Sequence, residues 1–172
     1  MKYQAILVLF MAFLISTNSS AQEVANDTIK KSFWKKLYGQ PVESAIIFMP
    51  IGHHIINPDV IFPFYTGINY KGFEISMYAN SHNDITTSIY YKRKQNLSEK
   101  WSFIYGIGLA YGYDGKLAEV EGLPFRETLF SGPITPMVGF EFNYKISKKI
   151  SINLSVAPPV VIAYGIRYAL NW

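Results

Sequence analysis

The chain has 172 residues, a formal net charge of +4 and no cysteine. This length fits one domain, and without cysteines no disulfide framework can stabilise it. The excess of basic residues is too mild to indicate a nucleic-acid partner. Hydrophobic residues make up 49% of the chain and aromatic residues 16%, which is rich for a soluble exported domain.

The first segment has the pattern of a secretory signal. Lys2 precedes an apolar run at 5–16, and small residues follow at 19–21. The apolar run is too short to span a bilayer comfortably. We therefore expect a cleaved signal peptide over 1–21 and a single mature domain over 22–172. Removing Lys2 leaves 15 Lys+Arg against 12 Asp+Glu, a net charge of +3 that suits an anionic lipid surface.

The segment 27–39 has helical periodicity. Ile29, Phe33 and Leu37 recur every four residues and form one apolar face, with lysines mostly around the other side. A cationic face opposite an aromatic and aliphatic one is typical of a helix that lies in a membrane interface. The alternative is an ordinary amphipathic helix on a soluble core.

From about residue 44 the period changes to two. Apolar and small or polar residues alternate in eight stretches, near 45–51, 64–70, 73–79, 85–92, 101–111, 138–144, 150–156 and 162–172. Eight is the smallest number of strands that closes a membrane barrel. The second face is Gly, Ser, Asn and Ala with few charges, whereas the exterior of a soluble barrel would carry many charged residues.

These patterns predict an all-β fold, an eight-stranded antiparallel transmembrane β-barrel over about 44–172, preceded by the N-terminal amphipathic helix over 27–39. Trp172 resembles the terminal aromatic signal of outer-membrane barrels, so we expect the protein in the outer membrane. We also expect a monomer. Inward charges must be paired because a buried unpaired charge is expensive. We expect an ion pair of Arg167 with Glu141, or with Glu74.

Histidines occur at two predicted strand ends. His53 and His54 end the first strand and His82 follows the third. First and third strands of an up-and-down barrel run in the same direction, so both segments finish at the same rim, where a hydroxyl, an amide and an imidazole could converge. The three histidines lack the supporting carboxylates and spacing of known metal sites, and we expect no metal.

In order and pattern, nearly all of the mature sequence resembles the lipid A palmitoyltransferases (PagP-type). An interfacial helix precedes the barrel, Pro50 stands shortly before a histidine, and Tyr78-Ala79-Asn80-Ser81 resembles the family's aromatic-x-Asp-Ser segment. By this resemblance Ser81 stands at the essential serine and Asn80 at the aspartate. His54 is favoured as the essential histidine because even spacing from Pro50 and Gly52 puts it on their face; His53 is the alternative.

The resemblance implies an acyltransferase that moves a palmitoyl-like chain from a phospholipid to lipid A without a cofactor. Its catalytic residues would be His54, Ser81 and Asn80, although an amide cannot act as a carboxylate base and could only orient the imidazole by hydrogen bonding. A lipid A deacylase is the alternative enzyme. A non-catalytic small barrel, lipid-binding or structural, is the alternative of another class.

Two further expectations concern the barrel wall and lumen. Proline removes a hydrogen-bond donor from the ladder, and the resemblance places prolines where strand pairing is interrupted and lipids enter sideways; here these are Pro50, Pro63, Pro133, Pro136, Pro158 and Pro159. Small inward residues would leave space for one acyl chain; these are Gly106, Gly108, Ala110, Gly139, Ala163 and Gly165.

Overall fold

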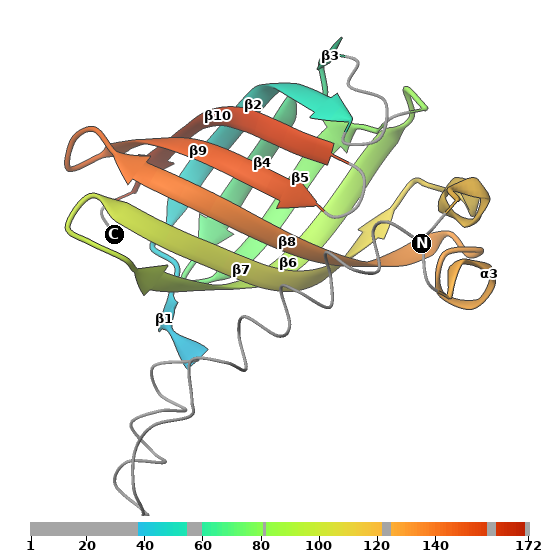
Figure 1. The fold of residues 1–172 in the computed structure, drawn as a ribbon, viewed down its shortest axis with the longest axis horizontal. Helices are drawn as coiled ribbons and strands as arrows, with labels where there is room; N and C mark the ends of the chain where they lie inside the picture. The colour runs from blue at the N-terminus through green and yellow to red at the C-terminus, as the bar shows by residue number, and fades with distance from the viewer. Residues whose placement is uncertain (1–37, 55–59, 81, 122–124, 158–160, 171–172) are drawn as a thin grey trace, which may run out of the picture. The chain divides into compact units, whose positions relative to one another are not determined.

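The computed structural model describes residues 38–54, 60–80, 82–121, 125–157 and 161–170 (Figure 1). The predicted signal peptide, nearly all of the predicted helix at 27–39, and Ser81, Pro158, Pro159 and Trp172 lie outside the described residues. The elements are β1 (Gln40–Pro41), β2 (Ala45–His54), β3 (Val60–Ile61), β4 (Tyr65–Tyr70), β5 (Phe73–Ala79), β6 (Ile85–Asn96), β7 (Trp101–Tyr111), η1 (Lys116–Glu119), α3 (Arg126–Leu129), β8 (Ile134–Lys145), β9 (Ile150–Ala157) and β10 (Val161–Ala169).

The eight long strands form a closed antiparallel barrel. Their order is β6-β5-β4-β2-β10-β9-β8-β7, and β6 also pairs with β7, which closes the ring. The two-residue strands β1 and β3 pair with β6 and β2. Closure satisfies the backbone hydrogen bonds around the ring and leaves no long sheet edge. The predicted all-β barrel of eight strands is confirmed.

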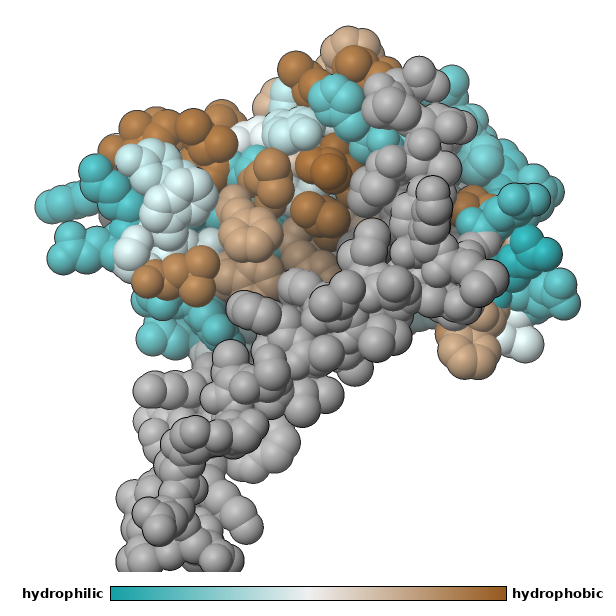
Figure 2. Space-filling model, in the orientation of Figure 1, coloured by the Kyte–Doolittle hydropathy of each residue, from teal (hydrophilic) through white to brown (hydrophobic). Residues whose placement is uncertain are grey.

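Apolar side chains cover the outside of the barrel and polar ones fill its interior. On β7, Ile107, Leu109 and Tyr111 are exposed while Ile104 and Ala110 are buried. Figure 2 shows apolar side chains over the strands on one face, with hydrophilic ones gathered at the two ends. In water, each exposed large aliphatic or aromatic side chain forgoes roughly 1.5–3 kcal/mol of burial. This inside-out distribution is that of a transmembrane barrel, as the alternation predicts.

No helix among the described residues is long and apolar enough to cross a membrane.

The two ends of the barrel differ in their connections. At one end, here called the turn end, short hairpins join β4 to β5, β6 to β7 and β8 to β9. The tightest is Lys71-Gly72, where both residues have positive φ (48° and 96°), as the favoured two-residue hairpin turn requires. The other end, the loop end, carries the longer connection 112–133 with η1 and α3. Short turns on one side and longer loops on the other are typical of bacterial barrels.

Candidate functional site

A β-bulge on β2 decides which way the two adjacent histidines face. Ile51 pairs with Tyr164 and Phe48 with Ile166, so three steps along β2 match two along β10. The extra residue shifts the alternation: Met49 and Gly52 are both buried although they are three positions apart, whereas regular alternation would bury positions two or four apart. His54 is evenly spaced from both Pro50 and Gly52, but Pro50 itself lies within the bulge. Only the spacing from Gly52 therefore shows that His54 faces inward.

His54 lies on the inner face with Gly52, and His53 lies on the outer face. The His53 ring meets the outward Tyr164 edge-on, with 5.5 Å between ring centroids. The Nε2 atom of His54 and the Nδ1 atom of His53 are both buried without a hydrogen-bond partner among the described residues, so the face on which each ring lies is what separates the two histidines. A half-buried imidazole with a free ring nitrogen at the mouth of the lumen is geometrically suited to proton transfer. Of the two histidines, the geometry favours His54, as the sequence analysis does.

The strand directions bring the two predicted site segments to the same rim. β4 pairs antiparallel with both β2 and β5, so β2 and β5 run in the same direction and both finish at the loop end. His54 ends β2, and Asn80 directly follows β5. The shared rim predicted for these segments is confirmed. The position of Ser81 stays a prediction because this residue lies outside the described part of the chain.

The side chain of Asn80 is fully engaged in holding its own turn. Its Nδ2 donates to the Thr86 hydroxyl and to the Gly112 carbonyl, both at 3.0 Å. Its Oδ1 accepts from the backbone N–H groups of His82 and Asp84 at 2.8 and 3.1 Å. An amide has two donors and two acceptor positions, so all four are used. None joins His54, and the predicted orienting contact is not formed; Asn80 instead fixes the loop that follows β5.

The pairing between β8 and β9 can be followed from the turn end as far as the described residues allow. The β8–β9 ladder runs from Lys145 to Phe140, whereas β8 itself begins six residues earlier at Ile134. Among the described residues, 134–139 pair only with β7, and the segment 158–160 that follows β9 lies outside the described part of the chain. The pairing partners Val156 and Ile162 place Phe140 level with His53. The predicted interruption at Pro136 therefore stays a prediction.

An interruption lies between β2 and the strand beside it. Pairing with β4 ends at Met49 opposite Tyr65 and resumes with β3 at Gly52 opposite Ile61. Pro50 falls in this interval on one side and Pro63 on the other. Proline cannot donate to the ladder, so its presence here is consistent with the predicted interruptions at Pro50 and Pro63.

Aromatic and apolar side chains line the lumen near the loop end. Tyr65 and Tyr78 stack with 5.4 Å between centroids. Beyond them Tyr113 and Leu117, from the connection after β7, pack on Ala110 and are buried. Burial raises the pKa of the Tyr113 hydroxyl. Outside the wall, the hydrogen bond from Lys116 to Asp84 raises the pKa of that lysine.

The prediction that the small inward residues leave open space is wrong for three of them. A Cβ added at Gly108 would lie 2.6 Å from a ring carbon of Tyr90, and one at Gly106 would lie 2.7 Å from the Lys92 side chain. At Gly165 it would meet Met49. These glycines allow a neighbour's larger side chain to cross the lumen. Gly139 is the exception, because its nearest neighbour, a Tyr90 ring carbon, is 3.8 Å away.

A buried layer of charges crosses the middle of the barrel. Lys92 bonds both Glu74, at 2.6 Å, and Glu141. Arg167 pairs with Glu141 at 3.3 Å, which confirms the predicted pair with Glu141; Glu74 pairs with Lys92 instead. The Tyr65 hydroxyl donates to Glu74. Two carboxylates and two cations make the layer neutral, which is how buried charges are tolerated.

Lys92 is not among the residues predicted to pair in the lumen. The alternation along β6 could have indicated it, because Lys92 lies two residues after Tyr90 and four after Ser88, which both face inward. Among the described residues, no group of three His, Asp or Glu side chains is placed to hold a metal ion.

Comparison with known proteins supports the fold alone. No family model matches the chain, and no curated protein matches it. A solved structure described as "De novo design of transmembrane beta-barrels" is similar, with a TM-score of 0.53 and 14% identity over 77% of this chain and 99% of the designed one. At this identity the likeness concerns architecture, and it agrees with the inside-out distribution of side chains.

Proposed function

We propose that the protein is an outer-membrane acyltransferase that moves a fatty acyl chain from a phospholipid to lipid A. The observation that carries the proposal is the combination at the loop end of an inward imidazole, His54, with the interrupted pairing of β2 beside Pro50 and Pro63. A reactive group facing the lumen and a lateral opening beside it suit a substrate that arrives from within the membrane.

In this proposal His54 takes the proton from the acceptor hydroxyl as that oxygen attacks the ester carbonyl of the phospholipid. The bond from the carbonyl carbon to the glycerol oxygen then breaks, and the protonated imidazole returns the proton to that leaving oxygen. Ser81 acts either as the nucleophile that carries the acyl group between two such steps, or as a positioning hydroxyl. Lipid A leaves with one more ester, and a lysophospholipid is the second product.

Asn80 has a positioning role in this scheme. Its four hydrogen bonds hold the chain on both sides of Ser81, so it contributes through the loop rather than through contact with the imidazole. This role requires an amide, because donors and acceptors are both used. It gives a physical reason for an asparagine where the resembling family has an aspartate.

The decisive experiment is mass spectrometry of lipid A from cells with and without the protein. We expect one additional acyl chain with the native protein, and none with His54→Asn or Ser81→Ala. His53→Asn is the matched control, because it makes the same change at the neighbouring outward position; it should retain the product. Identical lipid A in all strains would remove the acyltransferase proposal.

Two other outcomes separate the rival functions. Lipid A that is one chain lighter in the presence of the protein would identify a deacylase. Unchanged lipid A together with increased sensitivity to detergents on deletion would favour a non-catalytic barrel. Equal loss of product in His53→Asn and His54→Asn would mean that the inner face of β2 is not where the chemistry takes place.

A further inference from the structure

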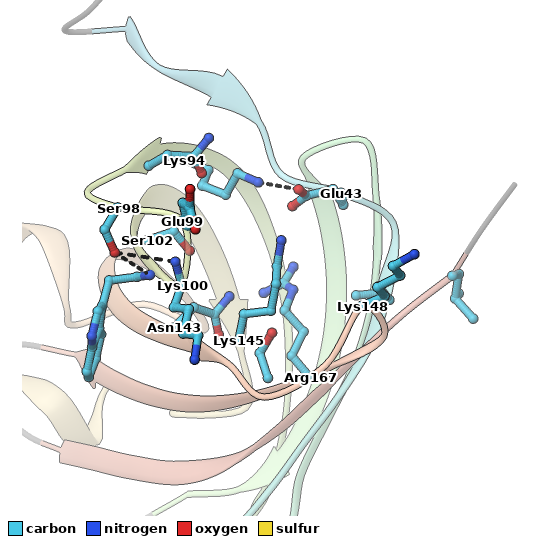
Figure 3. Close-up of a pocket in the computed structure, with 16 residues that line it drawn as sticks. Glu43, Lys94, Ser98, Glu99, Lys100, Ser102, Asn143, Lys145, Lys148 and Arg167 are labelled. Atoms are coloured by element: carbon cyan, nitrogen blue, oxygen red, sulfur yellow. Dashed lines mark hydrogen bonds and ion pairs between the residues drawn. The ribbon is translucent and has the colours of Figure 1, made fainter.

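A basic hollow opens at the turn end of the barrel, opposite the histidines. It has a volume of about 190 Å³, which is room for several water molecules. Figure 3 shows its lining side chains. The residues that define this hollow, here called the vestibule, include Lys94, Lys100, Asn143, Lys145, Lys148 and Arg167.

The charges of the vestibule are unbalanced. Five cationic side chains line it against two acidic ones, Glu43 and Glu99. Glu43 is already bonded to Lys94. Burial raises the pKa of Glu43, but the hydrogen bond and charge of Lys94 outweigh this, so its pKa lies below the ordinary value of 4.5. The remaining lysines at the mouth therefore face the vestibule with one carboxylate, Glu99, among them.

Arg167, one of the residues that line this hollow, has a buried donor without a partner among the described residues. Its side chain is only 5% exposed, and its Nη1 bonds Glu141. Its Nη2 is buried and has no partner among the described residues. A buried guanidinium N–H without an acceptor is costly. Because Arg167 lines the vestibule, an anion or water inside the vestibule is placed to accept this hydrogen bond.

The vestibule borders the buried charge layer through Arg167. This side chain lines the vestibule and also belongs to the network that joins it to Glu141 and Lys92. A hollow lined by cations, with one of them fixed in a buried ion network, is suited to hold an anion. Its size suits a group with several acceptor oxygens and part of its hydration shell.

We infer that the vestibule is a binding site for a phosphate group, held by Arg167 next to the buried charge layer and by Lys145 and Lys148 at its mouth. Arginine offers a planar fork of donors and lysine a point charge, and both are common phosphate ligands. Two sources present this chemistry at a membrane surface: the headgroup of a phospholipid and free inorganic phosphate. The inference does not depend on acyl transfer, which would take place at the other end of the barrel.

The test is an NMR titration of the isotopically labelled full-length barrel, refolded in a neutral maltoside detergent that contains no phosphate. Inorganic phosphate is added in one arm, and a short-chain phosphatidylglycerol below its micellar concentration in the other. We expect saturable shifts of the Asn143 and Ser151 backbone amides in at least one arm. At least tenfold tighter binding of the lipid identifies a headgroup site; equal or weaker binding identifies free phosphate.

Two double variants separate a built site from general surface charge. Lys145→Gln with Lys148→Gln removes two lining lysines, and affinity should fall at least tenfold. Lys71→Gln with Lys149→Gln removes two lysines from hairpins at the same end that do not line the vestibule; they lie against the rings of Tyr70 and Tyr168. This control should stay within about twofold. Equal losses in the two variants, or no saturable shift in either arm, would overturn the inference.

Discussion

The loop end and the turn end of the lumen present contrasting surfaces. The loop end has stacked tyrosines, an inward imidazole and an interruption in the pairing of β2 at Pro50. The turn end is basic, and its β8–β9 ladder is continuous from Phe140 to Lys145. An apolar, laterally open mouth suits a lipid chain, and a basic, closed one suits a hydrated anion. The difference teaches that one small barrel can carry two unlike surfaces when a layer of charges separates them.

The layer between the two ends should give the largest effect on stability. Glu141→Ala removes the carboxylate shared by Lys92 and Arg167 and leaves two buried cations with one remaining carboxylate partner. Removing one member of a buried ion pair costs about 3–5 kcal/mol, so unfolding in urea should shift by about that amount, or the barrel should fail to close. Glu121→Ala, at an exposed loop position, is the control. A shift below about 1 kcal/mol for Glu141→Ala would show that the layer does not stabilise the barrel.

The loop end can be tested through Asn80. In Asn80→Asp the carboxylate still accepts from the two backbone N–H groups, but it cannot donate to Thr86 and would face the Gly112 carbonyl. We expect a loss of about 1–3 kcal/mol, measured by thermal or urea unfolding, with faster hydrogen exchange at the amides of Gly112 and Asp84. Should Asn80→Asp instead raise acyl transfer without a loss of stability, the positioning role of the amide would be wrong.

The filled and open parts of the lumen can be compared with two glycine variants. Gly108→Ala forces a Cβ to within 2.3 Å of the Ile89 carbonyl oxygen and 2.6 Å of the Tyr90 ring, whereas Gly139→Ala meets only ordinary contact at 3.8 Å. Overpacking costs about 1–3 kcal/mol, so Gly108→Ala should lower the denaturation midpoint and Gly139→Ala should leave it nearly unchanged. Equal midpoints would indicate that Tyr90 moves away easily.

The smallest expected effect is the pH dependence of the Glu43–Lys94 pair at the turn end. Because the folded pKa of Glu43 lies below its ordinary value of 4.5, the pair contributes its full stabilisation above pH 4.5. This contribution is lost as pH falls through the folded pKa. Glu43 is half exposed, so Glu43→Gln should cost less than about 1 kcal/mol at pH 7. The difference between the unfolding curves of the two proteins should shrink steadily as the pH is lowered below 4.5; a difference that stays constant or grows would contradict this cause.

Much of the barrel follows from alternation along the chain. The predicted stretches 73–79 and 101–111 coincide with β5 and β7, because their outward and inward residues differ clearly in character. The bulge on β2 does not follow, since the inward residues Ile47 and Met49 are apolar too, and an apolar Ile51 is compatible with either face. Only the partner strand fixes such a register shift.

The candidate site is less predictable than the wall for a related reason. The two site segments share a rim because of strand direction alone, and strand direction follows from the order of the strands along the chain. The bonds of Asn80 depend on Thr86 and Gly112, residues that are distant in sequence or lie across a loop. The filling of the space above Gly108 depends on the side chain of Tyr90, on a neighbouring strand. Spacing along one strand carries no information about such partners.

The seam between β2 and β10 has a consequence for how the molecule is made. These strands are the first and last of the barrel, and they are paired from Ala45–Ala169 to His54–Val161. Until the final strand arrives, the growing chain has two unsatisfied edges that invite pairing with other chains. Contacts so distant in sequence form slowly. A truncated product that lacks β10 is therefore a candidate for aggregation. A chaperone that covers β2 during export would protect the strand edge that stays unpaired for the longest time.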